Sequence, residues 1–207
     1  MYNVNYTLKN MKNKKGYIFV KRLVDIVLSI ILIIVFSIIV WPWLIIINLF
    51  FTKGHPFFVS NRIGKNKKVF KILKFRSMRL DTPILSPYDT PKEEIYSYET
   101  KFGKFLRKSS LDETLQFFNI LVGQMSFIGP RPGAAEGEEL LVKARDSIEP
   151  SPFLVRPGLT GLSQTYYKRD HDVYKKAELD SKYVKELSFM TDFKIFLKTF
   201  GVIFKGR

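Results

Sequence analysis

The longest hydrophobic run of the chain covers residues 26–52 and contains no charged side chain: IVLSIILIIVFSIIVWPWLIIINLFFT. A straight helix of this length would reach about 40 Å, and the hydrocarbon core of a bilayer is about 30 Å thick. The run therefore predicts a membrane segment. A secretory signal peptide fits poorly, because the run is too long and no small-residue cleavage site follows it. A buried helix of a soluble core is the disfavoured alternative, because such runs seldom exceed about 14 residues.

Basic residues flank this run on both sides. Before it come Lys9, Lys12, Lys14, Lys15, Lys21 and Arg22, and after it come Lys53, Arg62, Lys65, Lys67, Lys68, Lys71, Lys74 and Arg76. Basic flanks favour the cytoplasmic side, and one span cannot place both of its ends there. We therefore expect a re-entrant hairpin that breaks at Pro42, which deletes a helical hydrogen bond and clashes with the preceding turn. An ordinary kinked span is the alternative.

Shorter patterns predict the elements that follow. Residues 69–78, VFKILKFRSM, alternate apolar with basic side chains, as a half-buried strand does. Residues 81–100 carry three prolines among Asp, Ser and Thr, which predicts a loop. A helix is expected over residues 111–122 and should end near Gly123. The predicted domain is therefore a mixture of helices and a small sheet.

The stretch SSLDETLQFFN, residues 109–119, places two carboxylates at the start of the expected helix. Ser110 and Glu113 have the spacing of a capping box, in which each side chain binds a free backbone N–H. Asp112 would lie in the first turn, where the helix dipole favours negative charge. Capping without any chemistry is a sufficient explanation of this stretch taken alone.

A polar stripe runs along the same expected helix. Asp112, Gln116 and Asn119 are spaced at i, i+4 and i+7 and would share one face. The other positions are mostly apolar, so the helix should be buried except along the stripe. A solvated stripe and a functional one are both consistent with this pattern.

Phenylalanines recur at helical spacing near the C-terminus. The apolar positions are Phe189, Phe193, Phe196, Leu197, Phe200 and Phe204, with Lys194, Lys198 and Lys205 between them. Such a helix either faces the core or lies flat on a membrane.

Two turn-rich stretches each present an arginine beside Pro and Gly. They are FIGPRPGA, with Arg131, and VRPGLTGL, with Arg156. Rigid turns with available N–H groups and a guanidinium can hold phosphate. Each stretch taken singly is equally explained as a turn with a surface arginine.

Composition narrows the class of partner. The 207 residues carry a formal net charge of +15, which favours anionic partners such as phosphorylated substrates, lipid headgroups or nucleic acid. The chain has no cysteine and only two histidines, which excludes disulfides and a cysteine-ligated zinc site. We find no repeat, no Walker loop, no G-x-G-x-x-G and no nucleic-acid-binding motif.

Taken together, these stretches resemble the bacterial sugar transferases, the monotopic phosphoglycosyl transferases. The resemblance extends from about Lys21 to the C-terminus and implies transfer of a sugar 1-phosphate from a UDP-sugar to a polyprenol (undecaprenyl) phosphate, with release of UMP. It rests on six ordered motifs: KRLVD, RIGKNKKVFKILKFRSM, KFGKFLRKSSLDE, GQMSFIGPRP, RPGLTGLSQ and ELSFMTDFKIFLKT.

The resemblance also implies roles for individual residues. Asp112 would be the nucleophile, and Glu113, together with Asp112, would bind Mg²⁺. The residues expected to hold phosphates or UMP are Lys74, Arg107, Arg131, Arg156 and Gln164. Asp25 matches an acidic position that we expect to be structural and paired to Lys21 or Arg22.

The sequence departs from the family pattern at three places, one of which is that ETLQFFN lacks the proline that is common after the two carboxylates. The family carries Ser-Pro within the membrane segment, where this chain has Ser37 and Ile38, and Pro42 follows one turn later. The position of the break is therefore open. A Gly-Arg pair that usually follows Gln164 is replaced by TYYKRD, which makes Arg169 an uncertain match.

The predicted fold class is α+β, a helix-rich, membrane-associated domain with a small β-hairpin or sheet. Residues 1–20 would form a basic leader, 21–53 the re-entrant helix-break-helix, and 54–207 a catalytic domain with an interfacial C-terminal helix. The resemblance implies the cytoplasmic face of the bacterial inner membrane, with downstream glycosyltransferases as possible partners and no nucleic acid. The rivals are a noncatalytic membrane scaffold for glycan assembly and a binder of anionic lipid or nucleic acid.

Overall fold

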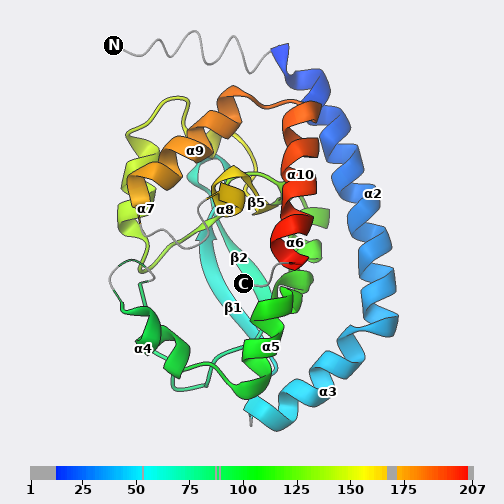
Figure 1. Cartoon of the computed structure of the whole chain (residues 1–207). Coiled ribbons are helices and arrows are strands. Elements are labelled where there is room, and N and C mark those ends of the chain that lie inside the picture. The colour runs from blue at the N-terminus through cyan, green and yellow to red at the C-terminus, as the bar shows by residue number, and fades with distance from the viewer. Residues whose placement is uncertain (1–12, 53, 87, 89, 167–171, 205–207) are drawn as a thin grey trace.

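The apolar run folds into two helices that meet at a break. The computed structural model describes residues 13–52, 54–86, 88, 90–166 and 172–204, with side chains to residue 201. Helix α2 (Lys15–Ile39) follows one edge of the molecule, and α3 (Trp41–Thr52) turns beneath the domain (Figure 1). α2 is the one described helix that is long and apolar enough to cross a membrane. It begins at Lys15, inside the range predicted as a leader, and residues 1–12 lie outside the described residues.

The break lies at Val40, between the two positions that the sequence left open. Ser37 and Ile38 continue α2 without interruption, and Pro42 is the second residue of α3. The Val40 N–H still donates to the Phe36 carbonyl, and the Leu44 N–H donates to the Val40 carbonyl. Because Pro42 has no N–H to continue the ladder, it accounts for a break just before it.

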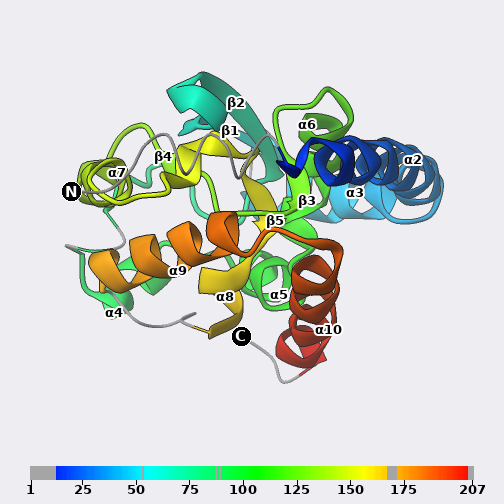
Figure 2. The same cartoon turned by 90° about the horizontal axis from the view of Figure 1, so that it is seen from above.

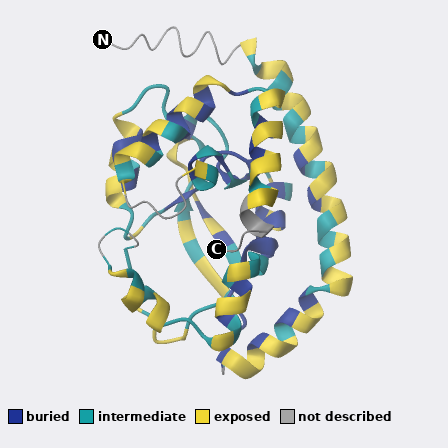
Figure 3. Cartoon of the chain, viewed as in Figure 1, coloured by how far each residue is buried: buried dark blue, intermediate teal, exposed yellow. Residues whose placement is uncertain are grey.

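The two helices expose apolar side chains outward and place polar ones inward. Figure 3 shows exposed residues along the outer side of α2 and α3. On the inner side, the Arg22 guanidinium donates to the carbonyls of Ile120 and Leu121 at 2.6 and 2.7 Å. Farther along, the Trp41 Nε1–H donates to Thr114 Oγ1, and the Asn48 amide donates to the Arg76 carbonyl. The apolar segment is thus attached to the domain along its length.

The pairing predicted for Asp25 is wrong. Asp25 is buried and accepts a hydrogen bond from the Phe127 N–H at 3.1 Å. Lys21 instead pairs with Asp192, and Arg22 binds backbone carbonyls. Asp25 is nevertheless structural, because it joins α2 to the strand that contains Phe127.

A small antiparallel sheet forms the centre of the domain. Strands β1 (Phe57–Ile63) and β2 (Val69–Phe75) make a hairpin, and β4 (Gly133–Ala134) adds to β1. β2 begins where the sequence predicted but ends at Phe75 rather than at residue 78. The loop predicted over 81–100 is partly helical, because α4 (Lys92–Ser97) begins directly after Pro91, a residue that can precede a helix without breaking it.

The helix expected over 111–122 forms in two parts. Residues Leu111–Gln116 make a 3₁₀ helix, η2, and Phe117–Leu121 continue as α6, with Gly123 at a φ of 85° just after the end. η2 packs on β2, and α6 packs on α2. Ser110 also ends the preceding α5 (Lys101–Ser109), so one residue joins two helices.

The two glycine-rich turns lie against each other. Strand β3 (Ser126–Ile128) pairs in parallel with β5 (Gly158–Thr160). The Gly129 N–H donates to the Thr160 carbonyl, and the Gly158 N–H donates to the Pro130 carbonyl. A Cβ at Gly158 would lie 2.1 Å from the Gly129 nitrogen, so only glycine permits this approach.

The remaining helices surround these strands. They are α7 (Glu139–Asp146), the short 3₁₀ helix η3 (Pro152–Leu154), α8 (Leu162–Tyr166), α9 (Val173–Lys185) and α10 (Phe189–Phe204). Figure 2 shows α7 and α2 at opposite ends of the molecule. Described phenylalanines of α10 are exposed, at positions 189, 193, 196 and 200, so this face does not point into the core. The mixture of helices with small sheets confirms the predicted class.

Candidate active site

Asp112 and Glu113 lie side by side in the first turn of η2, and each is 5% exposed. The capping box predicted from Ser110 and Glu113 does not form. Ser110 adopts a left-handed conformation, with φ 61°, and its side chain makes no capping hydrogen bond. The cause is its second position as the C-cap of α5, where its N–H donates to the Arg107 carbonyl. The Glu113 carboxylate is therefore available for other partners.

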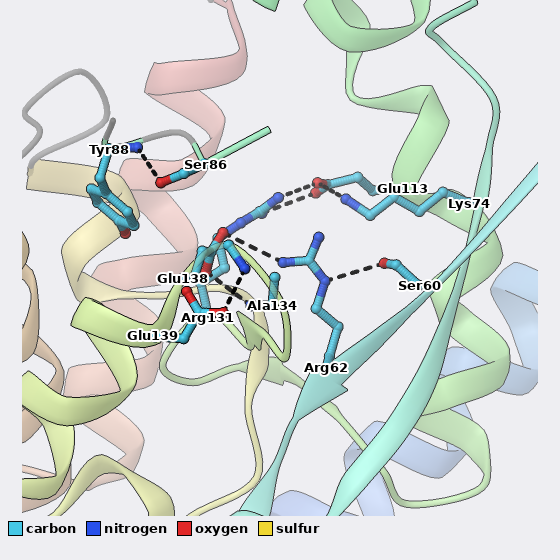
Figure 4. A network of polar contacts seen from close by, with 11 residues as sticks. Ser60, Arg62, Lys74, Ser86, Tyr88, Glu113, Arg131, Ala134, Glu138 and Glu139 are labelled. Carbon is cyan, nitrogen blue, oxygen red and sulfur yellow. Dashed lines mark hydrogen bonds and ion pairs between the residues drawn. The ribbon is translucent and has the colours of Figure 1, made fainter. Parts of the chain in front are cut away.

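Two cations bind the Glu113 carboxylate (Figure 4). Lys74 Nζ donates to Oε1 at 2.8 Å, and Arg131 Nη2 donates to the same oxygen at 2.7 Å. Lys74 comes from β2, and Arg131 comes from the turn between β3 and β4. Three residues that the sequence nominated separately thus meet at one carboxylate.

The pKa values of the two cations shift in opposite directions. Burial lowers the pKa of Lys74, an effect that the nearby Glu113 carboxylate opposes. The pKa of Arg131 is raised, because attraction by Glu113 outweighs its burial. The Glu113 carboxylate therefore favours the charged form of both cations.

A third ion pair extends this site and was missed by the sequence analysis. Arg62 on β1 lies 3.6 Å from the Glu138 carboxylate, which also accepts the Ala134 N–H at 2.9 Å. Arg62 further donates to Ser60 Oγ (Figure 4). Glu138 thereby fixes the backbone just after the Arg131 turn. No local pattern in the sequence connects two residues that are so distant.

The polar stripe of the helix is buried rather than solvated. Gln116 and Asn119 are nearly inaccessible, like Asp112. The Asn119 amide donates to the Lys71 carbonyl at 2.7 Å and so attaches the helix to β2. The Gln116 Nε2 has no hydrogen-bond partner among the described residues. Because η2 has about three residues per turn, Asp112 and Gln116 do not share the α-helical face that their spacing predicted.

Arg156 lies at the other end of this helical segment. Its Nε donates to the Gly123 carbonyl at 2.8 Å, next to the carbonyls that Arg22 binds. Ten residues separate Gly123 from Glu113, which corresponds to about 15 Å along a helix. The structure therefore does not bring Arg156 to the two carboxylates, and its role as a phosphate ligand stays a prediction.

The other described residues that were selected from the sequence, Arg107 and Gln164, lie in different parts of the fold. Arg107 pairs with Glu99 at 2.8 Å, near the C-terminal end of α5. The Gln164 amide donates to the Leu159 carbonyl in the second glycine-rich turn, and its Oε1 is buried without a partner in the described part of the chain. Arg169 lies outside the described residues.

The Asp112 and Glu113 carboxylates have the donor chemistry of a Mg²⁺ site, although they are only two in number. Among the described residues, no group of three or more Asp, Glu, His or Cys side chains could hold a metal ion. Mg²⁺ in phosphoryl-transfer sites commonly uses one or two carboxylates together with substrate phosphates and water. Asp112 and Glu113 supply that donor chemistry, so the residues fit a metal that arrives with its substrate.

Comparison with known proteins gives a consistent result. A model of the family described as bacterial sugar transferase matches residues 16–206. The chain is 38% identical over 196 residues to the UDP-glucose:undecaprenyl-phosphate glucose-1-phosphate transferase of Klebsiella pneumoniae, covering 90% of this chain and 40% of that protein. It is 31% identical over 212 residues to the undecaprenyl-phosphate galactose phosphotransferase of Salmonella typhimurium, covering 96% and 43%.

A third relative carries a different sugar in its name. The UDP-N-acetylgalactosamine-undecaprenyl-phosphate N-acetylgalactosaminephosphotransferase of Aeromonas hydrophila is 35% identical over 196 residues, covering 92% of this chain and 45% of that protein. This chain thus spans less than half the length of the curated relatives compared here. The names of these relatives share an acceptor and differ in the sugar.

Proposed function

The chain belongs to the bacterial sugar transferase family, and on that premise we propose that it transfers a sugar 1-phosphate from a UDP-sugar to undecaprenyl phosphate. UMP is the second product. The observation that carries this proposal is the buried Asp112–Glu113 pair, held at the start of a helix beside Lys74 and Arg131. A nucleophile, a second carboxylate and two phosphate-binding cations are the groups that this chemistry requires.

The proposed reaction has two steps at one phosphorus atom. An Asp112 oxygen attacks the phosphorus that bears the sugar, the bond from this phosphorus to the bridging oxygen breaks, and UMP leaves with that oxygen. An oxygen of the polyprenol phosphate then attacks the same phosphorus and releases the Asp112 carboxylate. The product is a polyprenyl diphosphate sugar, the first membrane-bound intermediate of a glycan. The position of Asp112 in the first turn of a helix favours a negative charge there.

Charge sets the roles of the surrounding residues. Arg131 offers a planar fork to phosphate oxygens, and Lys74 offers a single ammonium. Both are bound to Glu113 in the structure and would exchange part of that contact for the diphosphate. We propose that Asp112 and Glu113 hold Mg²⁺ when the substrate is present. The ion would neutralise charge that otherwise repels a carboxylate from the diphosphate.

The proposed place is the cytoplasmic face of the inner membrane, with α2 and α3 as a re-entrant hairpin. Contacts at both ends of this segment support it. The Lys14 ammonium binds the carbonyls of Val184 and Lys185, and Asn48 binds those of Pro56 and Arg76. A helix that crossed the bilayer would carry one of these ends away from the domain.

Topology is testable with single cysteines, because the sequence has none. We would place them at the exposed, unpaired positions Lys15 and Lys68, on either side of the hairpin. Both should resist a membrane-impermeant thiol reagent in intact cells and react after the inner membrane is permeabilised. Reaction of the Lys15→Cys variant alone from outside would show a full span.

The function itself is tested by UMP release. Purified chain in detergent is supplied with undecaprenyl phosphate and each of several UDP-sugars, including glucose, galactose and N-acetylgalactosamine. Release that requires both substrates is expected for at least one sugar, which would also identify the donor. A noncatalytic scaffold would release no UMP with any of them and would keep its partners when Asp112 is replaced.

A further inference from the structure

A basic cleft lies at the end of the helical segment opposite the two carboxylates. It is open to solvent and is bordered by α2, η1 (Lys65–Lys67), η3 and β3. Its lining includes Lys21, Arg22, Asp25, Lys65 and Arg156. Four cations thus share this lining with one described acidic side chain.

Two of these charges have protein partners. Lys21 pairs with Asp192, and the Asp25 carboxylate accepts the Phe127 N–H. Arg22 and Arg156 use part of their donor capacity on the carbonyls that end α6, and a guanidinium has five N–H groups. The Lys65 ammonium has no hydrogen bond or ion pair among the described residues. An excess of donors and positive charge therefore faces the cleft.

The like charges are close enough to affect one another. The pKa of Lys65 is lowered by partial burial and further by the neighbouring Arg156. Bringing cations together in a partly buried place costs free energy unless an anion joins them. Capping of α6 explains the two arginines but gives Lys65 no reason to be there.

Apolar side chains lie within and near the cleft. Ile18 and Leu187 belong to its lining, and α2 also exposes apolar side chains on its other sides, such as Leu23 and Val24, which are about half exposed. A ligand that joins a phosphate to hydrocarbon chains matches this succession of cations and apolar side chains. A free nucleotide would leave the apolar part uncovered.

We propose that Arg22, Lys65 and Arg156 form a binding site for the phosphate of an anionic glycerophospholipid. The acyl chains of the lipid follow the exposed side of α2. The site is separate from the one that contains Asp112, about 15 Å away along the helix. It does not depend on the proposed transferase activity.

The test measures lipid retention by the full chain. The protein is reconstituted with equal amounts of phosphatidylcholine and phosphatidylglycerol, extracted in detergent, and the lipids that remain bound are quantified by mass spectrometry. The wild type should retain phosphatidylglycerol preferentially. Lys65→Gln should weaken this retention about fivefold, as expected for one lysine beside an anionic headgroup. Because the Lys65 ammonium has no hydrogen bond or ion pair among the described residues, the substitution should leave the fold intact, and a loss of retention would report on the lipid.

Lys68→Gln is the matched control, because it removes the same charge from an exposed position outside the cleft lining. It should retain the lipid as the wild type does. Equal losses in both variants, or none in Lys65→Gln, would overturn the site. Glycerol 3-phosphate, which lacks acyl chains, should not displace the lipid at matched concentration. Displacement would show a site for free phosphates instead. UMP release is not measured here, so failure of the transferase proposal would leave this result unaffected.

Discussion

Two arginines from similar turns, Arg131 and Arg156, contact opposite ends of the helical segment formed by η2 and α6. Arg131 and Arg156 both precede a proline, and both turns pack backbone to backbone through Gly129 and Gly158. Arg131 reaches the Glu113 carboxylate at the start of the segment, whereas Arg156 reaches the Gly123 carbonyl at its end. The difference shows that a motif specifies the chemistry of a side chain, and the fold specifies its destination.

The two ends also differ in electrical character. The first turn holds carboxylates that are balanced by Lys74 and Arg131, and the last turn holds carbonyls that are balanced by Arg22 and Arg156. Cations near the last carbonyls complement the helix dipole, so stability is a sufficient explanation for the contacts of Arg22 and Arg156 with these carbonyls. At the other end, two adjacent buried carboxylates cost stability. Such a cost is expected where a protein keeps the residues for function. Substitutions can separate these two explanations.

The largest effect is expected from Asp112→Asn. The amide is nearly isosteric but cannot form the acyl phosphate, so UMP release should fall by several powers of ten, on the order of losses seen for other nucleophiles. Thermal unfolding should change little. Retention of more than a few per cent of UMP release would show that Asp112 is not the nucleophile. The proposed difference between a functional N-terminal end and a structural C-terminal end of the helical segment would then be lost.

Glu113→Gln should have the next largest effect. The substitution weakens the proposed Mg²⁺ site and loosens Lys74 and Arg131, so slight UMP release should remain and excess Mg²⁺ should restore part of it. Chelation by EDTA should stop the wild type, and added Mg²⁺ should restart it. Full wild-type UMP release in EDTA would contradict a metal role for this end of the helix.

Arg131→Ala should reduce the kcat/KM of UMP release by about 10- to 100-fold. A charge-assisted hydrogen bond contributes about 1.5–3 kcal/mol, and here it is lost toward both Glu113 and the phosphate. Arg131→Lys should recover only part, because the planar fork is lost. Unchanged kcat/KM in the alanine variant would show that Arg131 is an ordinary surface arginine in a turn, with no role in UMP release.

Arg156→Ala should act mainly on stability. The lost hydrogen bond to Gly123 should lower the free energy of unfolding by about 1–2 kcal/mol, measured by denaturant titration in detergent. UMP release should fall less than in Arg131→Ala. A larger fall in kcat/KM than in Arg131→Ala would mean that Arg156 reaches the substrate and that the two turns are equivalent after all.

Local patterns predicted a good part of the fold and of the candidate site. The uncharged run and Pro42 indicated two helices with a break, and alternation located the start of β2. Asp112, Glu113, Lys74 and Arg131 were selected separately from the sequence. In the structure, Lys74 and Arg131 both donate hydrogen bonds to Glu113. These successes depend on short-range rules of hydropathy and backbone geometry.

The failures have several physical causes, and some of them depend on a partner that is distant in the sequence. Ser110 lost its capping role because α5 ends on it, and the polar stripe is buried because Asn119 binds β2. Arg62 and Glu138 pair across a fold that no local spacing encodes. The helix α4 was missed because the prolines before it were taken to extend the loop past Pro91.

One contact links the break between α2 and α3 to the candidate active site. Trp41, beside the break, donates its indole N–H to Thr114, the neighbour of Glu113, at 3.0 Å. If α2 and α3 form the proposed re-entrant hairpin, this contact sets the depth of the two carboxylates relative to the break. The proposed lipid-linked acceptor would then meet Asp112 at a depth set by the fold, and a thicker or thinner bilayer would have to deform around the protein.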